Sequence, residues 1–159
     1  MRAREGLADC LSLLGEHDLA IEHYRDMLRL NPSDNQGIRY NLLSSLLETN
    51  NIDAAEDLLA QFPGEYSAVW LFTRALITFI RQGDSVGARQ RLKEAKRENP
   101  YVIPYLLGQR PMPDALPEYI GFGDEDEAVA YVAEYAGDWL DTPRVLQWLK
   151  ASNRKKKEG

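Results

Sequence analysis

Residues 6–32 read GLADCLSLLGEHDLAIEHYRDMLRLNP, and this stretch decides the fold. Leucines at helical spacing lead to Gly15, which can end a helix because glycine readily adopts the left-handed conformation. A second apolar stripe then runs through Ala20 and Tyr24 to Asn31-Pro32, where proline stops the helix. The stretch therefore predicts two helices joined by a tight turn.

The same pattern returns with a period of 34 residues. The positions in phase are Ala20, Ala54 and Ala88; Tyr24, Leu58 and Leu92; Gly15 and Gly83; Asn31-Pro32 and Asn99-Pro100. A fixed period of this length is typical of a stacked repeat array, in which neighbouring helix pairs bury each other's apolar faces. We expect the three alanines to be buried where the two helices of each pair cross.

The organisation that follows is all-α. We predict a right-handed superhelix of three helix pairs, over about residues 1–34, 35–66 and 67–100. Two further helices within residues 101–153 are expected to cap it, which gives about eight helices in total. Residues 154–159 are expected to form a basic flexible tail.

These residues resemble the tetratricopeptide repeat family over residues 1–100. The matching positions are Ala8, Gly15, Ala20, Tyr24 and Pro32 in the first repeat, and Gly83, Ala88, Leu92, Ala95 and Pro100 in the third. The second repeat departs from the family pattern at Thr49 and Gln61, and its proline comes early at Pro63. The resemblance implies a helical solenoid that binds proteins or peptides, without catalysis.

The C-terminal block begins with a segment rich in proline and glycine. Residues 99–123 are expected to be irregular, with a turn of helix near 114–119. Asp124 is placed to cap a helix whose first turn carries Glu125, Asp126 and Glu127, favourable charges at the positive end of a helix dipole. Thr142-Pro143 predicts the start of the last helix.

This block is similar to a segment of the suppressor-of-tumorigenicity-seven family and to related bacterial repeat proteins. The residues that carry the likeness are Asn99-Pro100-Tyr101-Val102, Tyr105-Leu106-Leu107-Gly108, Gly123, Glu127-Ala128-Val129, Tyr131 and Trp139. The block lies inside a longer chain in those proteins, so the resemblance implies an excised domain of a longer polypeptide.

Charge argues against nucleic acid as a partner. The chain has 19 basic and 25 acidic residues and a net charge of −6, whereas phosphate affinity comes mainly from lysine and arginine. No apolar run is long enough to cross a membrane. The single Cys10 cannot form an internal disulfide, which favours a reducing compartment, and we expect a cytoplasmic location.

The sequence shows no constellation that predicts an enzyme, a metal site or a cofactor. His17 and His23 are six residues apart, a poor spacing for two ligands on one helix. Cys10 lies in an apolar stretch and is expected in the core rather than as a nucleophile. Gly121-Phe122-Gly123 lacks the preceding strand that a nucleotide-binding loop requires.

A concave groove is the candidate site. In this repeat class the first helix of each pair lines the concave surface, and arginine with aromatic residues is favoured in binding hot spots. The predicted partner-binding residues are Arg2, Arg39, Tyr40, Trp70, Arg74, Ile77 and Arg81. The expected occupant is an acidic, aromatic-containing peptide, and Arg39→Glu with Arg74→Glu is expected to abolish binding while leaving the fold intact.

Two functions stay open at this point. The first is an interaction scaffold that holds a partner's peptide in the concave groove. The second is an architectural module of a longer chain, whose groove is filled by its own C-terminal block. They differ in whether the groove is open in the structure.

Overall fold

The computed structural model describes the backbone of residues 2–158 and the side chains of residues 3–154. The described residues form nine helices and no strand, which confirms the all-α prediction with one helix more than expected. The chain divides into two compact units, residues 1–63 and 64–159, which are described in turn.

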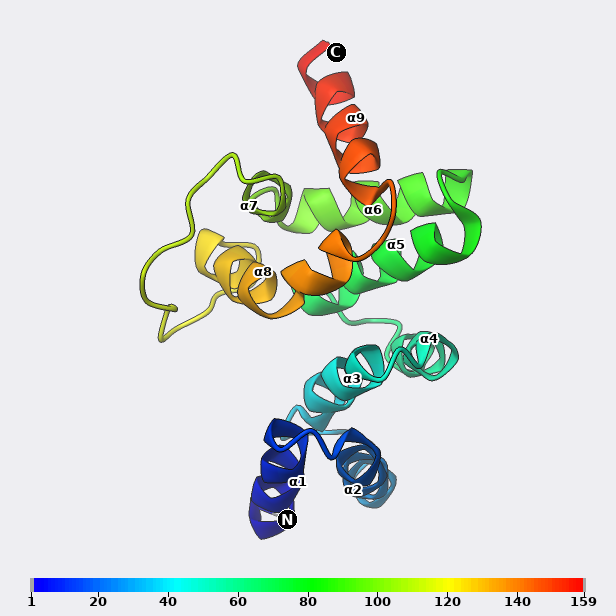
Figure 1. The fold of residues 1–159 in the computed structure, drawn as a ribbon, viewed down its shortest axis with the longest axis vertical. Helices are drawn as coiled ribbons and strands as arrows, with labels where there is room; N and C mark the ends of the chain where they lie inside the picture. Colours follow the sequence, from blue (N-terminus) through cyan, green and yellow to red (C-terminus); the bar gives the residue numbers. More distant parts are fainter. Residues whose placement is uncertain (1, 159) are drawn as a thin grey trace. The chain divides into compact units, whose positions relative to one another are not determined.

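The first unit consists of two helical hairpins (Figure 1). Its helices are α1 (Arg2–Leu13), α2 (His17–Leu30), α3 (Ile38–Glu48) and α4 (Ile52–Gln61). Gly15, with φ of 82°, makes the turn from α1 to α2, as predicted, because an L side chain there would be strained. Helices α1 and α3 each pack on α2, so the two hairpins share one core.

A carboxylate ties three helices of the first unit together. Asp9 Oδ1 accepts a hydrogen bond from the Tyr24 hydroxyl at 2.5 Å and another from Asn41 Nδ2 at 2.9 Å. Tyr24 is buried, and this burial, together with the bond to Asp9, raises the pKa of its phenol. The contact joins α1 and α2 to α3 within the unit.

The repeat register shifts by one residue in the second hairpin. Ala20 and Ala88 are fully buried, as predicted, but Ala54 is only half-buried and Ala55 takes the buried position. The cause is the turn before α4, where Asn50 adopts a φ of 55° and Asn51 becomes the N-cap. Ala55 follows the left-handed Asn50 by five residues, as Ala20 follows Gly15 and Ala88 follows Gly83, so the expectation for Ala54 was wrong.

This register gives a test on two adjacent residues. Ala55→Leu should overpack the crossing of α3 and α4 and lower the free energy of unfolding by about 1–3 kcal/mol. Ala54→Leu places the same side chain toward a surface depression beside Leu58 and Phe62 and should cost well under that. Urea melts of both variants measure the difference, and equal losses would contradict the register.

The second unit contains the remaining five helices. They are α5 (Ala68–Gln82), α6 (Val86–Glu98), α7 (Val102–Leu106), α8 (Glu125–Leu140) and α9 (Val145–Glu158). Serine side chains cap α5 and α6: Ser67 Oγ accepts from the Trp70 N–H at 3.3 Å and Ser85 Oγ from the Ala88 N–H at 3.0 Å. Asp124 caps α8 through the Glu127 N–H at 2.8 Å, which confirms that prediction.

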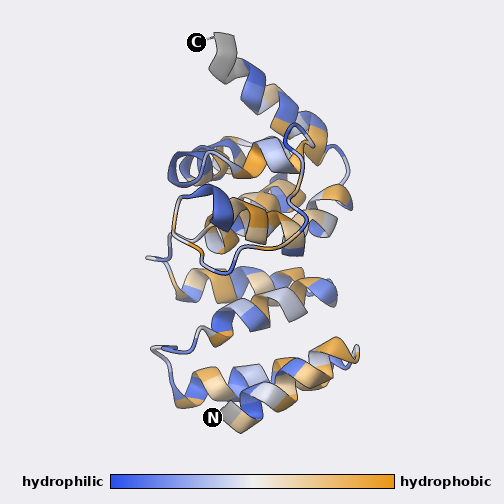
Figure 2. Ribbon diagram, turned by 90° about the vertical axis from the view of Figure 1, so that its left-hand side faces the viewer, coloured by the Kyte–Doolittle hydropathy of each residue, from blue (hydrophilic) through white to orange (hydrophobic). Residues whose placement is uncertain are grey.

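The hydropathy of the helices follows this packing. Most helices carry both orange and blue stretches in Figure 2, as amphipathic helices do, and the coloured part of α9 changes from orange to mostly blue along the helix. The buried side of α5 is the most extensive, with nine buried residues among its fifteen. The core of the second unit is therefore built around α5.

Two local expectations for the C-terminal block were wrong. The short helix α7 lies at Val102–Leu106, where Pro104 fits within the first turn, and not at 114–119, which Pro117 interrupts. The last helix begins at Val145, after Arg144 turns the chain with a φ of 67°, rather than at Thr142-Pro143. That helix continues to Glu158.

Candidate functional site

Helix α8 covers one face of α5. The hydroxyl oxygens of Thr73 and Tyr131 lie 3.2 Å apart, and Trp139 Nε1–H donates to the Tyr131 hydroxyl at 2.9 Å. The rings of Phe72 and Tyr131 are 5.8 Å apart. Burial raises the pKa of Tyr131, so this hydroxyl stays protonated and can bond both neighbours. The C-terminal block is thus fastened to the first helix of the third repeat by a buried polar network.

The carboxylate of Glu127 anchors the start of α8 from inside the core. Its oxygens accept from the Ala68 N–H at 3.0 Å, from Asn99 Nδ2 at 2.9 Å and from the Gly123 N–H at 2.9 Å. Glu127 is 6% exposed, so its partners replace water. The side chain joins the N-terminus of α5, the end of α6 and the loop before α8. Its role reaches beyond the helix-dipole effect that the sequence predicted for it.

Removal of this carboxylate should loosen the second unit. Glu127→Ala leaves three donors without their acceptor, each at a cost of about 1–3 kcal/mol unless water enters, so we expect a loss on the order of 3 kcal/mol or more. Asp126→Ala is the matched control, because Asp126 lies in the same helical turn but is exposed. If both variants melt alike, Glu127 acts only through the helix dipole.

The structure places the predicted groove residues in different environments. Trp70 and Ile77 are 0% and 2% exposed, so the prediction that they contact a partner was wrong: they are core residues. Arg74 is half-buried and Arg81 is exposed, and each already has a partner within the chain. Burial, and secondarily Arg91, lowers the pKa of the Arg74 guanidinium. The side chain of Arg2 lies outside the described residues.

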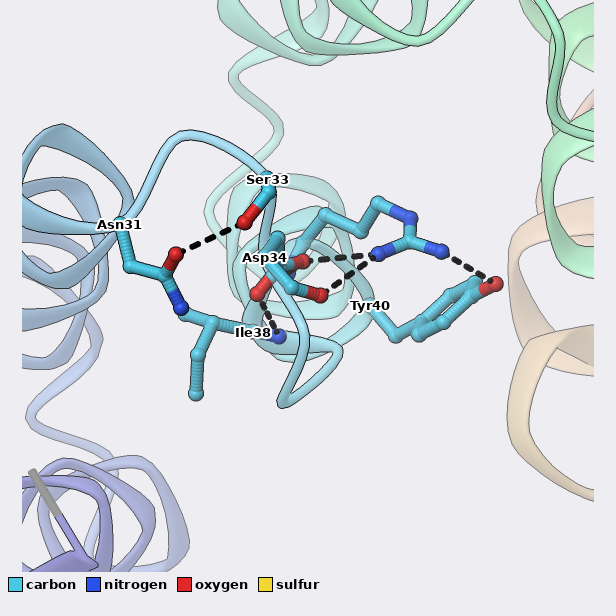
Figure 3. A network of polar contacts seen from close by, with 6 residues as sticks. Asn31, Ser33, Asp34, Ile38 and Tyr40 are labelled. Atoms are coloured by element: carbon cyan, nitrogen blue, oxygen red, sulfur yellow. Dashed lines mark hydrogen bonds and ion pairs between the residues drawn. The ribbon is translucent and has the colours of Figure 1, made fainter.

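A polar network around Asp34 supports the turn before α3 (Figure 3), and Arg39 belongs to it. Asp34 is buried, and its backbone lies in the left-handed region with a φ of 52°. Its carboxylate accepts hydrogen bonds from the backbone N–H groups of Ile38 and Arg39, at 2.7 and 2.9 Å. The Arg39 guanidinium donates to Asp34 Oδ2 at 2.9 Å and to the Tyr40 hydroxyl at 3.2 Å. It also lies over the Tyr40 and Phe62 rings, at 4.6 and 5.1 Å.

These contacts make Arg39 and Tyr40 parts of a structural network that caps α3. Reversal of the charge at Arg39 would bring a second carboxylate against a buried one, so the expectation that Arg39→Glu leaves the fold intact is withdrawn. The side chains that the sequence assigned to binding serve, at this point of the chain, to hold the α2–α3 turn.

Stability measurements can test this role. Arg39→Glu should lower the free energy of unfolding by about 3 kcal/mol, because it leaves the Asp34 charge uncompensated. Arg29→Glu makes the same charge change on an exposed side chain and should cost less than about 1 kcal/mol. Near-equal melts of the two variants would exclude a structural role for Arg39.

A groove of about 630 Å³ lies between α6 and α9. Leu92, Trp148 and Ala151 provide apolar walls. The charged residues along the groove are the bases Arg89, Lys93, Lys96 and Arg97 and the acids Asp84 and Glu94. The two ends are held by polar contacts: Asp84 accepts from Trp148 Nε1 at 2.9 Å and from Arg89 Nε at 2.7 Å, and Lys96 Nζ donates to Ser152 Oγ at 3.1 Å. The ring of Trp148 stacks on Phe79 at 4.6 Å between centroids, which fixes its position. We refer to this feature as the α6–α9 groove.

The charge around this groove is opposite to that of the chain. Helix α6 carries five basic residues and two acidic ones, and exposed Lys150 and Arg154 follow on α9. A second depression, of about 720 Å³ between α2 and α4, has a similar apolar floor, but its two helices are rich in acidic residues. The sequence analysis missed the α6–α9 groove because it summed charges over long segments. Charges summed over α6 alone would have shown the excess of basic over acidic residues.

Other chemistry finds no support among the described residues. They contain no group of three or more histidine, cysteine, aspartate or glutamate side chains that could hold a metal ion. Cys10 is exposed, so its expected place in the core was wrong. Within the part of the chain that the structure describes, no helix is long and apolar enough to cross a membrane.

Comparison with known proteins supports the class of repeat. The family model of the tetratricopeptide repeat matches residues 11–69, which run from the first predicted repeat into the third. The match supports a tetratricopeptide repeat protein, and proteins of this class in general mediate protein–protein interaction and are typically non-catalytic. No curated protein and no solved structure matches the chain. No comparison supports the resemblance of the C-terminal block to the suppressor-of-tumorigenicity-seven family.

Proposed function

We propose that the chain is a protein-interaction module that takes an acidic, aromatic-containing segment of a partner protein into the α6–α9 groove. The observation that carries this proposal is the combination of apolar walls and a basic rim in a protein of net charge −6. Apolar walls favour a partner's aromatic or aliphatic side chain, and the rim favours carboxylates beside it.

Electrostatics make this groove the better of the two depressions for such a segment. Charge acts over about 8 Å at physiological salt, so a ligand in the groove meets the bases of α6 rather than the net charge of the whole chain. Arg97 is 75% exposed at its side chain, and its ion pair with Glu98, at 3.8 Å, leaves it open to a bound segment. The depression between α2 and α4 is lined by Arg25 and Arg29 together with Asp57, and the other charged residues of α4 are all acidic.

The location differs from the concave groove that the sequence predicted. A peptide that runs along the Thr73 face of α5 would have to displace α8 and break the contacts of Tyr131 and Glu127. This observation favours the second function considered above for that face: the third repeat accepts its own C-terminal block and so acts as an architectural support. The proposal has three further parts. The C-terminal block is related to the suppressor-of-tumorigenicity-seven family, the chain is part of a longer polypeptide, and its location is cytoplasmic.

Peptide titration tests the groove. A fluorescein-labelled peptide in which phenylalanine is flanked by glutamates should bind the chain, and its affinity should fall as salt rises. Lys93→Glu with Arg97→Glu should weaken binding on the order of tenfold or more, because the rim then repels the peptide. Fluorescence anisotropy measures the dissociation constants, and circular dichroism checks that the variant is folded.

The matched control reverses two bases beside the other depression. Arg25→Glu with Arg29→Glu changes the net charge by the same amount and should leave the affinity within about twofold, since long-range charge alone contributes little at physiological salt. An equal loss in both variants, or equal binding of a peptide with alanine in place of phenylalanine, would overturn the α6–α9 groove as the site.

A further inference from the structure

The loop between α7 and α8 exposes apolar side chains on an acidic segment. Residues 109–123, here called the display loop, leave the body of the second unit and return to the start of α8 (Figure 1). Its large exposed residues are Leu116 (62%), Tyr119 (85%), Ile120 (53%) and Phe122 (77%). Such a concentration in one segment exceeds the scattered apolar residues of an ordinary surface and indicates an interaction site.

The end of the display loop is held in place. A Cβ at Gly121 would lie 2.6 Å from Asp124 Oδ2, and one at Gly123 would lie 2.9 Å from the backbone oxygen of Glu98. Gly121 also donates its N–H to Asp124 Oδ2 at 3.0 Å, and Gly123 bonds Glu127. Phe122 stands exposed between two glycines whose N–H groups bond Asp124 and Glu127. The backbone that presents Phe122 therefore loses little freedom on binding, which favours affinity.

The other end of the display loop is tied by charge. Glu125 accepts a hydrogen bond from the Tyr105 hydroxyl at 2.7 Å and forms an ion pair with Arg110. These two contacts hold the pKa of Glu125 below its usual range. Arg110 is the one basic residue of the display loop, and Glu125 neutralises it. The carboxylates of Asp114 and Glu118 therefore set the charge that the loop presents to a partner.

The display loop therefore has the chemistry that the α6–α9 groove is built to receive. We infer that the partner segment of the groove is the display loop of a second copy of this chain, an inference that rests on the groove proposed above. Phe122 or Tyr119 would lie against the apolar lining of the groove, and the loop carboxylates would lie against Lys93 and Arg97. Charge complementarity between the two surfaces selects this occupant.

The contact has a specific symmetry. The loop and the groove are different surfaces of one chain, so a loop-to-groove contact joins unlike patches. A pair that does not exchange both loops about a two-fold axis leaves one loop and one groove unused. Association should therefore continue beyond a single pair as concentration rises, or end in a closed ring.

Sedimentation velocity of the full chain from micromolar to millimolar concentration tests this inference. The weight-average mass should rise with concentration and should fall again in high salt. Tyr119→Ser with Phe122→Ser should abolish the association, and so should Lys93→Glu with Arg97→Glu. Leu13→Ser with Leu140→Ser is the control, since it removes two exposed apolar side chains elsewhere and should change nothing.

Mixing the two inactive variants gives the sharpest result. The loop variant keeps an intact groove and the groove variant keeps an intact loop, so an equimolar mixture should form a one-to-one complex and nothing larger. Absence of that complex, loss of association in the control, or a wild-type chain that stays monomeric at millimolar concentration would overturn the inference.

The peptide titration separates this inference from the proposed function. A chain that binds the glutamate-flanked phenylalanine peptide but stays monomeric has a working groove whose partner is another protein, so the self-association fails alone. A chain that neither binds the peptide nor associates lacks the groove function altogether. Association that survives the groove variant but not the loop variant places the loop on another surface and also overturns the inference.

Discussion

A single buried carboxylate, that of Glu127, sets the arrangement of the second unit. A charged group out of water is tolerated only where donors surround it, and here the donors come from the start of α5, the end of α6 and the loop before α8. Each segment must be in place for the others to be satisfied. The same carboxylate fixes the start of α8, the helix that covers α5 and carries Tyr131, and the end of the display loop at Gly123.

The repeat pattern was predictable because it rests on local periodicity, and the exceptions are equally physical. Helix starts and stops at Gly15, Gly83, Ser85 and Asp124 follow from conformational and capping preferences that neighbouring residues set. The one-residue shift that buries Ala55 arises from the left-handed Asn50, and a spacing of alanines cannot reveal it. Proline placed the irregular segment correctly but did not identify the helix at α7.

Side-chain roles were harder to predict than helices because they depend on contacts between distant segments. Trp70 and Ile77 are residue types that are common in binding surfaces, but both side chains are buried in the core. Arg39 looked like a ligand for an external carboxylate, and the carboxylate it binds is Asp34, five residues earlier. The α6–α9 groove joins residues more than fifty positions apart, so only its basic helix was visible in the sequence.

Because the display loop is anchored at both ends, changes in its sequence between the anchors have little effect on the stability of the core. Arg110 and Gly121 bracket a stretch whose own side chains point outward and whose conformation costs the fold little. Doubling the length of such a loop costs only about 0.6 kcal/mol in closure entropy. Insertions and substitutions between these anchors can therefore accumulate through evolution, or be introduced by engineering, and redirect the chain to new binding partners while the helices beneath stay the same.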